Sequence, residues 1–441
     1  MKLKKYKLAD IAKTEISGID KKTIEGEKPV RLCNFVDVYY NWAITKDKAK
    51  RFMIASAKQS EIDRFSINKG MVAITKDSET KYDIGVATYI ADNFDNIVLG
   101  YHCALITPNP TIVDGKYLNA FMHTQYIQKY FENNASGSGQ RYTLSNDTIS
   151  NIPVLLPSME VQHTIGKLLA DLDRKIELNR QINDNLEAMA KQLYDYWFVQ
   201  FDFPNEEGKP YKSSGGAMVW NEKLKREIPE GWHCGTLLDI AEYTNGLACQ
   251  KYRPTDNNKL PVIKIKEMHD GLSADTEWVK ADIPDGVKVF DGDVLFSWSA
   301  SLEVMLWAYG NGGLNQHIFK VTSKNGYPRS FYFYQLIHYV GVFKQMAEAR
   351  KTTMGHITQD HLRQSTIALP PNVDITNKLE EKLCPIFDEI VKNDQEIMAL
   401  TKQRDELLPL LMNGQASVNY HLSASFLFSL ILYRDKYKFL T

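Results

Sequence analysis

The chain has 441 residues, which is too long for one ordinary domain, and its 44% hydrophobic and 24% charged content excludes a wholly disordered or fibrous protein. Its formal net charge of −1 gives no general indication of nucleic-acid binding. The five cysteines include no C-x-x-C pair, which predicts neither a disulfide framework nor a zinc ribbon. The sequence starts without an apolar leader, and its longest apolar run (422–433) is shorter than the roughly 18 residues that span a bilayer. Together these features predict a cytoplasmic protein without a membrane span.

The first half of the chain combines strand and helix patterns. Short apolar runs bounded by turn residues predict strands at 29–38, 70–75 and 97–106. A helix-like stretch follows at 117–133, then a Gly/Ser-rich loop at 135–141 and a strand that ends on proline at 152–157. Together these elements predict a mixed α/β lobe over residues 1–157.

Residues 158–200 carry a stronger periodic pattern, and we expect one long helix there. Its apolar stripe follows heptads, with Ile182 and Met189 among the predicted inward positions. The principal stripe positions are Ile165, Leu172, Asn179 and Leu186. The next segment, 201–227, is rich in Pro, Gly, Glu and Ser over its first part, which predicts a linker.

The second half of the chain repeats this order of elements. Strands are predicted at 260–265, 293–298 and 316–321. A helix at 331–350, a polar segment at 351–355 and a strand at 366–371 complete a second lobe over 228–371. A second long helix is expected over 372–415, with principal stripe positions Leu379, Ile386, Asn393 and Leu400. Residues 416–441 form a C-terminal extension to which the pattern assigns no role.

The two halves match each other at a nearly constant offset. The offset is 213 residues before the long helices and 214 within them. Matched pairs include Leu144 and Ile357, and Ile165 and Leu379. Further upstream the match is looser, and there His102 pairs with His317 at an offset of 215. The offset stays nearly constant from the end of each lobe into its long helix. This predicts a duplicated architecture rather than chance similarity.

The two predicted helices need to be covered along their length. Each is about 60 Å long at 1.5 Å per residue, so no single lobe can surround it, and its apolar stripe requires a partner helix. The economical arrangement is an antiparallel coiled coil in which Asn179 and Asn393 fix the register. Two separate surface helices are the alternative. The expected fold class is α+β, with two similar mixed α/β lobes separated by two long antiparallel coiled-coil helices.

Three features in this order resemble a known family. A strand ending in Leu156–Pro157 leads into the first long helix, the sequence Ile-Pro-Glu-Gly-Trp opens the second lobe at 228–232, and Leu-Leu-Pro-Leu-Leu-Met-Asn-Gly-Gln closes the second helix at 407–415. With their duplication, these features resemble the specificity (S) subunit of type I restriction–modification enzymes over about residues 1–418.

The resemblance implies that each lobe is a target-recognition domain reading one half of a split sequence in double-stranded DNA. It implies that the helices set the gap between the half-sites and dock two methyltransferase (modification) subunits, and that restriction (motor and nuclease) subunits complete the complex. S-adenosylmethionine, ATP and Mg²⁺ are then expected on the partner subunits, and no cofactor or metal on this chain. The complex would methylate or restrict DNA, and this chain would be a non-catalytic subunit.

The absence of catalytic motifs agrees with that expectation. The chain has no Gly-x4-Gly-Lys-Ser/Thr phosphate loop and no Asn-Pro-Pro-Tyr-like methylation motif. Glu79 and Lys81 have a nuclease-like spacing without an upstream Pro-Asp, and His102 lies in an apolar strand pattern that predicts a core histidine. Two alternatives stay open, a self-sufficient DNA-modifying or DNA-cleaving enzyme with its own recognition repeats, and a protein-interaction scaffold.

Candidate DNA contacts are polar, basic and aromatic residues in segments that follow strands or precede a long helix, because such side chains contact phosphates and read base edges. In the first lobe these are Tyr40, Asn41, Trp42, Lys76, Ser138, Gln140 and Arg141. In the second lobe they are Lys264, Lys266, His269, Trp298, Gln316, His317, Arg350, Lys351 and Thr352. Core packing is the alternative role for the aromatic residues, and a solvated surface for the lysines.

The charge of each predicted lobe limits this interpretation. Residues 1–155 hold 21 basic and 17 acidic residues, for a net charge of +4. Residues 228–370 hold 14 basic and 15 acidic residues, for a net charge of −1. A second lobe that binds DNA must therefore concentrate its positive charge locally.

Overall fold

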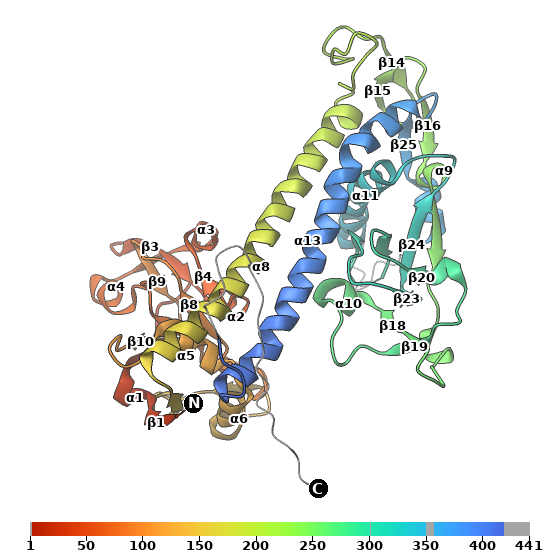
Figure 1. Ribbon diagram of the computed structural model, residues 1–441. Helices are drawn as coiled ribbons and strands as arrows, with labels where there is room; N and C mark the ends of the chain where they lie inside the picture. The colour runs from red at the N-terminus through yellow and green to blue at the C-terminus, as the bar shows by residue number, and fades with distance from the viewer. Residues whose placement is uncertain (1, 300, 350–356, 419–441) are drawn as a thin grey trace. The chain divides into compact units, whose positions relative to one another are not determined.

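The computed structural model describes residues 2–299, 301–349 and 357–418 (Figure 1). These residues divide into two compact units, one made of residues 2–176 together with 400–418, and the other of the described residues of Glu177–Ala399. Among the described residues, no helix is both long and apolar enough to cross a membrane.

The first unit contains a five-stranded sheet in the order β2-β10-β6-β8-β4. Its strands are β2 (Ala12–Ile16), β10 (Cys103–Pro108), β6 (Val72–Thr75), β8 (Ala87–Ile90) and β4 (Ala43–Ile44). All neighbours pair antiparallel except β4 and β8, which are parallel. The strands β6 and β8 are buried along their whole length, including Thr75 and Thr88.

Smaller sheets and short helices complete the first lobe. The small sheets are β5 (Met53–Ala57), β3 (Lys28–Cys33) and β9 (Ile97–Leu99); β11 (Ser136–Ser138), β12 (Arg141–Thr143) and β7 (Asp77–Ser78); and β1 (Lys4–Lys7) with β13 (Pro153–Leu156). The helices are α1 (Leu8–Ile11), α2 (Phe35–Tyr39), α3 (Lys46–Ala49), α4 (Gln59–Phe65), α5 (Gly115–Met122), α6 (Gln125–Asn134) and α7 (Asn146–Ser150). The pair β1–β13 joins the start of the lobe to the strand that enters the long helix.

The second unit repeats this plan. One sheet has the order β17 (Ala241–Asn245), β24 (Ile318–Ser323), β21 (Val294–Ser297) and β22 (Glu303–Leu306). The other has the order β19 (Trp278–Lys280), β18 (Lys259–Ile263), β23 (Gly312–Leu314) and β20 (Lys288–Val289). Further elements are β16 (His233–Thr236) paired with β25 (Thr366–Leu369), α9 (Leu237–Ile240), α10 (Ile265–Asp270), α11 (Arg329–Ala349), α12 (Gln359–Gln364) and the 3-10 turns η2 (Cys249–Lys251) and η3 (Asp285–Val287).

Equivalent backbone contacts confirm the duplication. The amide of Leu8 donates to Ile152 O at 2.9 Å, and the amide of Leu237 donates to Ser365 O at 3.2 Å. The strand pairs β2–β10 and β17–β24 also have the same register, beginning at Ala12 opposite Pro108 and at Ala241 opposite Ser323. Because these contacts join equivalent positions of the two halves, the two lobes share one backbone frame.

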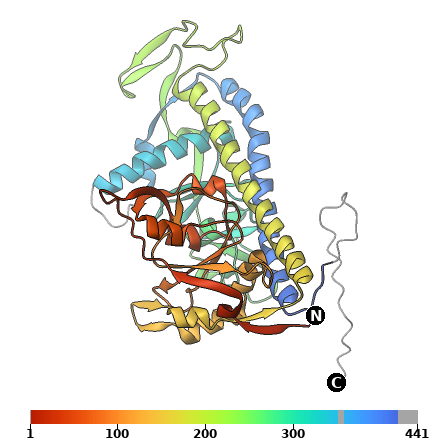
Figure 2. The ribbon, with the colours of Figure 1, turned by 90° about the vertical axis from the view of Figure 1, so that its left-hand side faces the viewer.

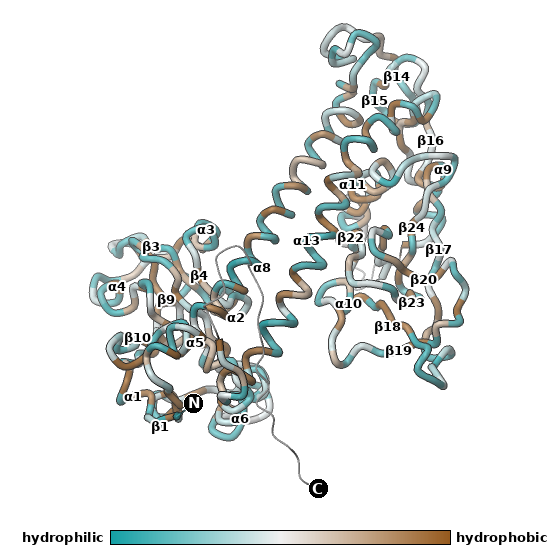
Figure 3. Tube along the Cα trace, viewed as in Figure 1, coloured by the Kyte–Doolittle hydropathy of each residue, from teal (hydrophilic) through white to brown (hydrophobic). Residues whose placement is uncertain are grey.

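The two long helices confirm the predicted antiparallel pair. They are α8 (Met159–Tyr194), continued by a π-helical turn η1 (Asp195–Val199), and α13 (Asp374–Met412). They run side by side in Figures 1 and 2, and Figure 3 shows hydrophobic residues recurring along both. In the second unit, Asn183 contacts Asp394 at 2.8 Å. In the first unit, Asp173 pairs with Arg404 at 3.6 Å.

The buried asparagines bond across the pair. Asn179 Nδ2 donates to Glu396 Oε2 at 2.8 Å. Asn393 Nδ2 donates to Asn183 Oδ1 at 2.8 Å, and both side chains are almost fully buried. A buried amide without a partner is costly, so these bonds favour one register of the helices over its neighbours.

The inward face of α8 differs in part from the predicted heptads. Ile165, Leu172 and Asn179 are buried, and Leu186 is partly buried. On α13, Leu379, Asn393 and Leu400 are buried and Ile386 is partly buried. The predicted inward positions Ile182 and Met189 are wrong, since they are 38% and 59% exposed, whereas Asn183 and Ala190 are buried. A straight helix has 3.6 residues per turn, so a strict 3.5-residue repeat drifts off the buried face by about 20° per heptad.

Several short elements also differ from the prediction. The strand expected at 29–38 ends at Cys33 and is followed by α2, and the strand expected at 97–106 is two strands separated by a turn. The helix expected at 117–133 is broken into α5 and α6. The expected loop at 135–141 belongs to the hairpin β11–β12. Two of these breaks have local causes, since the side chains of Asn34 and Thr124 cap the starts of α2 and α6.

The expected linker at 201–227 is largely structured. Phe201 and Phe203 are buried, and their rings pack on Trp232 of the second lobe at 5.4 Å between centroids. The hairpin of β14 (Met218–Asn221) and β15 (Arg226–Pro229) crosses the predicted lobe boundary at 228. Of the predicted C-terminal extension, residues 419–441 lie outside the described residues.

The buried stripe of α8 can be tested against an exposed leucine of the same helix. Leu172 is fully buried and Leu178 is 53% exposed. Replacing Leu172 with Ala should lower the free energy of unfolding by about 2–5 kcal/mol, because it leaves a cavity. Replacing Leu178 with Ala, the control, should change it by less than about 0.5 kcal/mol. Urea unfolding of the full chain measures both; equal losses would contradict the assigned face.

Candidate nucleic-acid interface

Three segments of the first lobe meet beside the end of strand β6. After Thr75 the chain reaches Lys76, whose amide donates to His102 O at 2.8 Å and whose carbonyl accepts from the Leu144 amide at 2.7 Å. His102 has a φ of 69°, in the left-handed region that non-glycine residues rarely adopt. This turn ends β9 and starts β10, and it directs the imidazole into a polar cluster rather than into the core. The predicted core role of His102 is therefore wrong.

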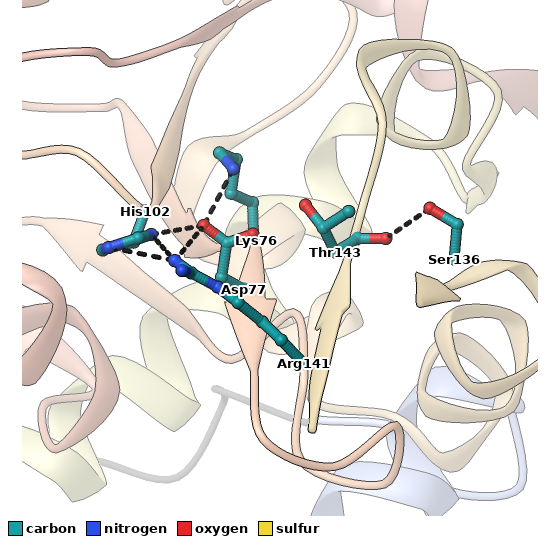
Figure 4. A network of polar contacts seen from close by, with 6 residues as sticks. All are labelled: Lys76, Asp77, His102, Ser136, Arg141 and Thr143. Carbon is teal, nitrogen blue, oxygen red and sulfur yellow. Dashed lines mark hydrogen bonds and ion pairs between the residues drawn. The ribbon is translucent and has the colours of Figure 1, made fainter. Parts of the chain in front are cut away.

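The carboxylate of Asp77 lies at the centre of this cluster, which we call the Asp77 cluster (Lys76, Asp77, His102, Arg141 and Thr143; Figure 4). Asp77 Oδ2 contacts Lys76 Nζ at 2.8 Å, His102 Nδ1, and Arg141 Nη2 at 3.6 Å. Burial raises the pKa of Asp77, but hydrogen bonds from Lys76, Thr143 and His102 outweigh it and lower the pKa to about 2. The carboxylate is therefore ionised at neutral pH.

The hairpin β11–β12 brings Arg141 to this carboxylate. Gly139 (φ 60°) permits the tight turn of the hairpin, and Gln140 is exposed at its tip. Gly137 lies within β11, where a Cβ would come within 2.1 Å of Arg141 O. The Arg141 side chain is 62% exposed, and its Nη2 lies 2.7 Å from His102 Nδ1. With Ser17, Gly18 and Tyr101, the cluster lines an open hollow of about 560 Å³. Of the predicted residues, the structure thus brings Lys76, Gln140 and Arg141 into one region.

We call the place where Lys76, His102 and Leu144 meet through backbone hydrogen bonds the corner of the first lobe. The second lobe has an equivalent corner with the same backbone hydrogen bonds and different side chains. The amide of Trp298 donates to His317 O at 3.2 Å, and its carbonyl accepts from the Ile357 amide at 3.0 Å. Trp298 Nε1 donates to Asn245 Oδ1 at 3.0 Å, and its ring lies 5.6 Å from that of His317. Gln316 Nε2 lies 3.3 Å from His317 Nε2. Three predicted residues, Trp298, Gln316 and His317, are therefore neighbours.

The other predicted basic residues that the structure describes in the second lobe each face a carboxylate on or beside α10. Lys264 pairs with Glu277 at 2.5 Å, Lys266 with Asp275 at 3.9 Å, and His269 with Glu303 at 3.1 Å. The positive charge of the two lysines is partly neutralised within the lobe, so they do not form the strong basic patch that the sequence interpretation required. Arg350, Lys351 and Thr352 lie outside the described residues.

The remaining predicted residues of the first lobe separate into exposed and packed groups. Tyr40 is 76% exposed, whereas Asn41 donates through Nδ2 to Asp37 O at 2.8 Å. The Trp42 ring stacks on His123 at 4.3 Å, and the guanidinium of Arg404 lies 4.8 Å from its centroid. This arrangement favours a packing role for Trp42. Ser138 forms part of β11.

The sequence interpretation missed Asp77, Asn245 and Thr143. Asp77 directly follows Lys76 after a buried strand, which was a usable signal, but an isolated acid does not suggest DNA binding. Asn245 and Thr143 gave no signal, because only the fold places them beside their partners. Over the ranges that the structure describes, no group of three or more His, Cys, Asp or Glu side chains could hold a metal ion.

Comparisons with known proteins place this geometry in context. The family described as type I restriction modification DNA specificity domain matches residues 2–188 and 229–401, one match for each lobe and its helix. The chain is 27% identical over 326 residues to the type I restriction enzyme MjaIX specificity subunit of Methanocaldococcus jannaschii, covering 71% of each chain. It is 25% identical over 403 residues to the HindI specificity subunit of Haemophilus influenzae, covering 77% of this chain and 85% of that one.

A solved structure has the same fold. The S subunit of a type I restriction–modification system from M. genitalium superposes with a TM-score of 0.56 at 13% identity, covering 93% of this chain and 96% of the other. The family match covers most of the chain and repeats once in each half, as the duplicated lobes require. The chain therefore belongs to the type I restriction–modification specificity subunits and carries two target-recognition domains.

Proposed function

We propose that each lobe binds one half of a bipartite target in double-stranded DNA through the corner built around Lys76 in the first lobe and Trp298 in the second. The observation that carries this proposal is the shared backbone frame at the two corners, which holds different polar and aromatic side chains. Side chains of these types hydrogen-bond to base edges and phosphates. A constant frame with variable side chains is suited to reading two different half-sites.

The partner assignments form the second part of the proposal. The chain acts without an active site of its own, in the cytoplasm, and the pair α8–α13 sets the gap between half-sites and docks two methyltransferase subunits. Restriction subunits join the same assembly. S-adenosylmethionine, ATP and Mg²⁺ bind to those partners, where methyl transfer and cleavage occur. The resemblance to specificity subunits supports this division of labour, and it disfavours both a self-sufficient enzyme and a general protein scaffold.

The two neighbouring aromatic candidates should behave differently. Tyr40→Ala should weaken DNA binding by the methyltransferase complex and leave thermal unfolding unchanged, because the ring is exposed. Trp42→Ala should destabilise the chain by about 1–3 kcal/mol, because it removes the stacking and cation–π contacts. Binding titrations and thermal unfolding of both variants test this. A stable Trp42→Ala variant with impaired DNA binding would reverse the assignment.

Exchange of one lobe tests whether the lobes read independently. Residues 231–371 would be replaced by those of a family member that recognises a different target, so that strands β16 and β25 are exchanged together and the β14–β15 hairpin stays intact. The chimeric complex should methylate a motif in which one half has changed and the other half and the gap are retained. Single-molecule methylation mapping measures this, with the wild-type complex as control. A change in both halves would refute independent reading.

A paired insertion tests the helices as a spacer. Duplicating residues 182–185 in α8 and 387–390 in α13 lengthens both helices at facing positions, since Asn183 lies against Asn393 and Asp394. Four residues add about 6 Å, so the mapped gap should grow by one or two base pairs. Duplication in α8 alone, the control, puts the pair out of register and should reduce assembly. An unchanged gap in an assembled double variant would contradict the spacer role.

A further inference from the structure

We propose that Asp77 is a positioning residue for target recognition by the first lobe, and that it holds Arg141 so that the guanidinium presents paired donors to a guanine edge. This inference rests on the proposed DNA-binding function of the lobe. Asp77 itself is buried, with a side-chain exposure of 10%, so it acts through the side chains around it.

The geometry allows the Asp77 carboxylate to orient the Arg141 side chain. The contacts of the guanidinium within the cluster use Nη2, which faces Asp77 and His102. The side chain is otherwise exposed at the rim of the hollow, so its remaining N–H donors are directed away from the carboxylate. Both paired-donor edges of a guanidinium include Nη2, which carries two N–H groups. One of them can face the cluster while the other, beside an Nη1 N–H, completes the parallel pair that guanine O6 and N7 accept.

The positive charges of the cluster require an anion at the position of the Asp77 carboxylate. Lys76 and Arg141 carry positive charge, and both approach the same oxygen of Asp77. Without the carboxylate, the two cations and the imidazole would lose their common partner, and the exposed arginine would be free to change its side-chain conformation. The low pKa of Asp77 keeps that partner charged throughout the neutral range.

The second lobe shows that the frame itself does not need this carboxylate. Ser299 follows Trp298 as Asp77 follows Lys76, and it is buried in the same frame. There the indole is fixed by its hydrogen bond to Asn245 instead. The carboxylate is therefore a feature of the first lobe alone, and its loss should reduce selectivity at the first half-site alone.

The test compares Asp77→Asn, Asp77→Ser, Arg141→Ala and the double variant Asp77→Asn/Arg141→Ala in the assembled methyltransferase complex. Asp77→Ser introduces the residue that the second lobe tolerates at this position, so folding should be retained, and thermal unfolding checks this. The matched control is Asp83→Asn, which removes an exposed carboxylate bonded to Tyr39 in the same lobe. Selectivity is measured on a library of duplexes with single substitutions in both half-sites, at two salt concentrations.

We expect Asp77→Asn and Asp77→Ser to relax selection for guanine about tenfold at one position of the first half-site, the position also relaxed by Arg141→Ala. The double variant should be no more relaxed there than Arg141→Ala alone, because Asp77 acts through Arg141. Asp83→Asn should retain wild-type selectivity. The second half-site should be unaffected in every variant.

Three results would overturn the inference. Unchanged selectivity in Asp77→Asn would show that the carboxylate does not position a reading group. A loss spread over both half-sites would indicate a structural role, and an equal loss for all sequences with a smaller salt dependence would indicate a phosphate contact. A wild-type complex that shows no bipartite preference would instead refute the underlying DNA-binding function, so the two failures can be told apart.

Discussion

The constraint on which this structure depends is the apolar stripe of its two long helices. The 36 residues of α8 and the 39 residues of α13 extend further than a lobe can cover, so each helix needs the other. The asparagines Asn179, Asn183 and Asn393 favour this pairing, because their buried amides all have partners in the observed register. Each lobe is then attached through a two-stranded sheet whose second strand leads into a long helix.

Features that repeat many times could be predicted from the sequence. The helices and the duplication rest on a periodicity kept over tens of residues, so errors at single positions cancel. Within α8 the heptad assumption still failed at Ile182 and Met189, because small angular errors accumulate along a straight helix. The overall class of the fold was therefore predictable, and the exact face of the helix was not.

Features that depend on one contact could not be predicted. The turn at His102 requires a positive φ that the apolar sequence around it does not suggest, and it is accompanied by contacts to Asp77 and Arg141 from distant segments. The β11–β12 hairpin likewise depends on its pairing with β7, which local composition does not show. Of the candidate site, the sequence indicated Lys76 and Arg141, but the carboxylate that joins them became apparent only in three dimensions.

The weak net charge of the lobes bears on how they can select DNA. Net charge gives affinity for any sequence, whereas directional donors and acceptors give discrimination. In the second lobe the lysines beside α10 face carboxylates, and the shared corner instead carries Trp298 and His317. The backbone bonds that form each corner do not involve these side chains, so residues there can change without loss of the frame. Duplication of such a frame lets the two half-sites vary separately while the helix pair stays the same.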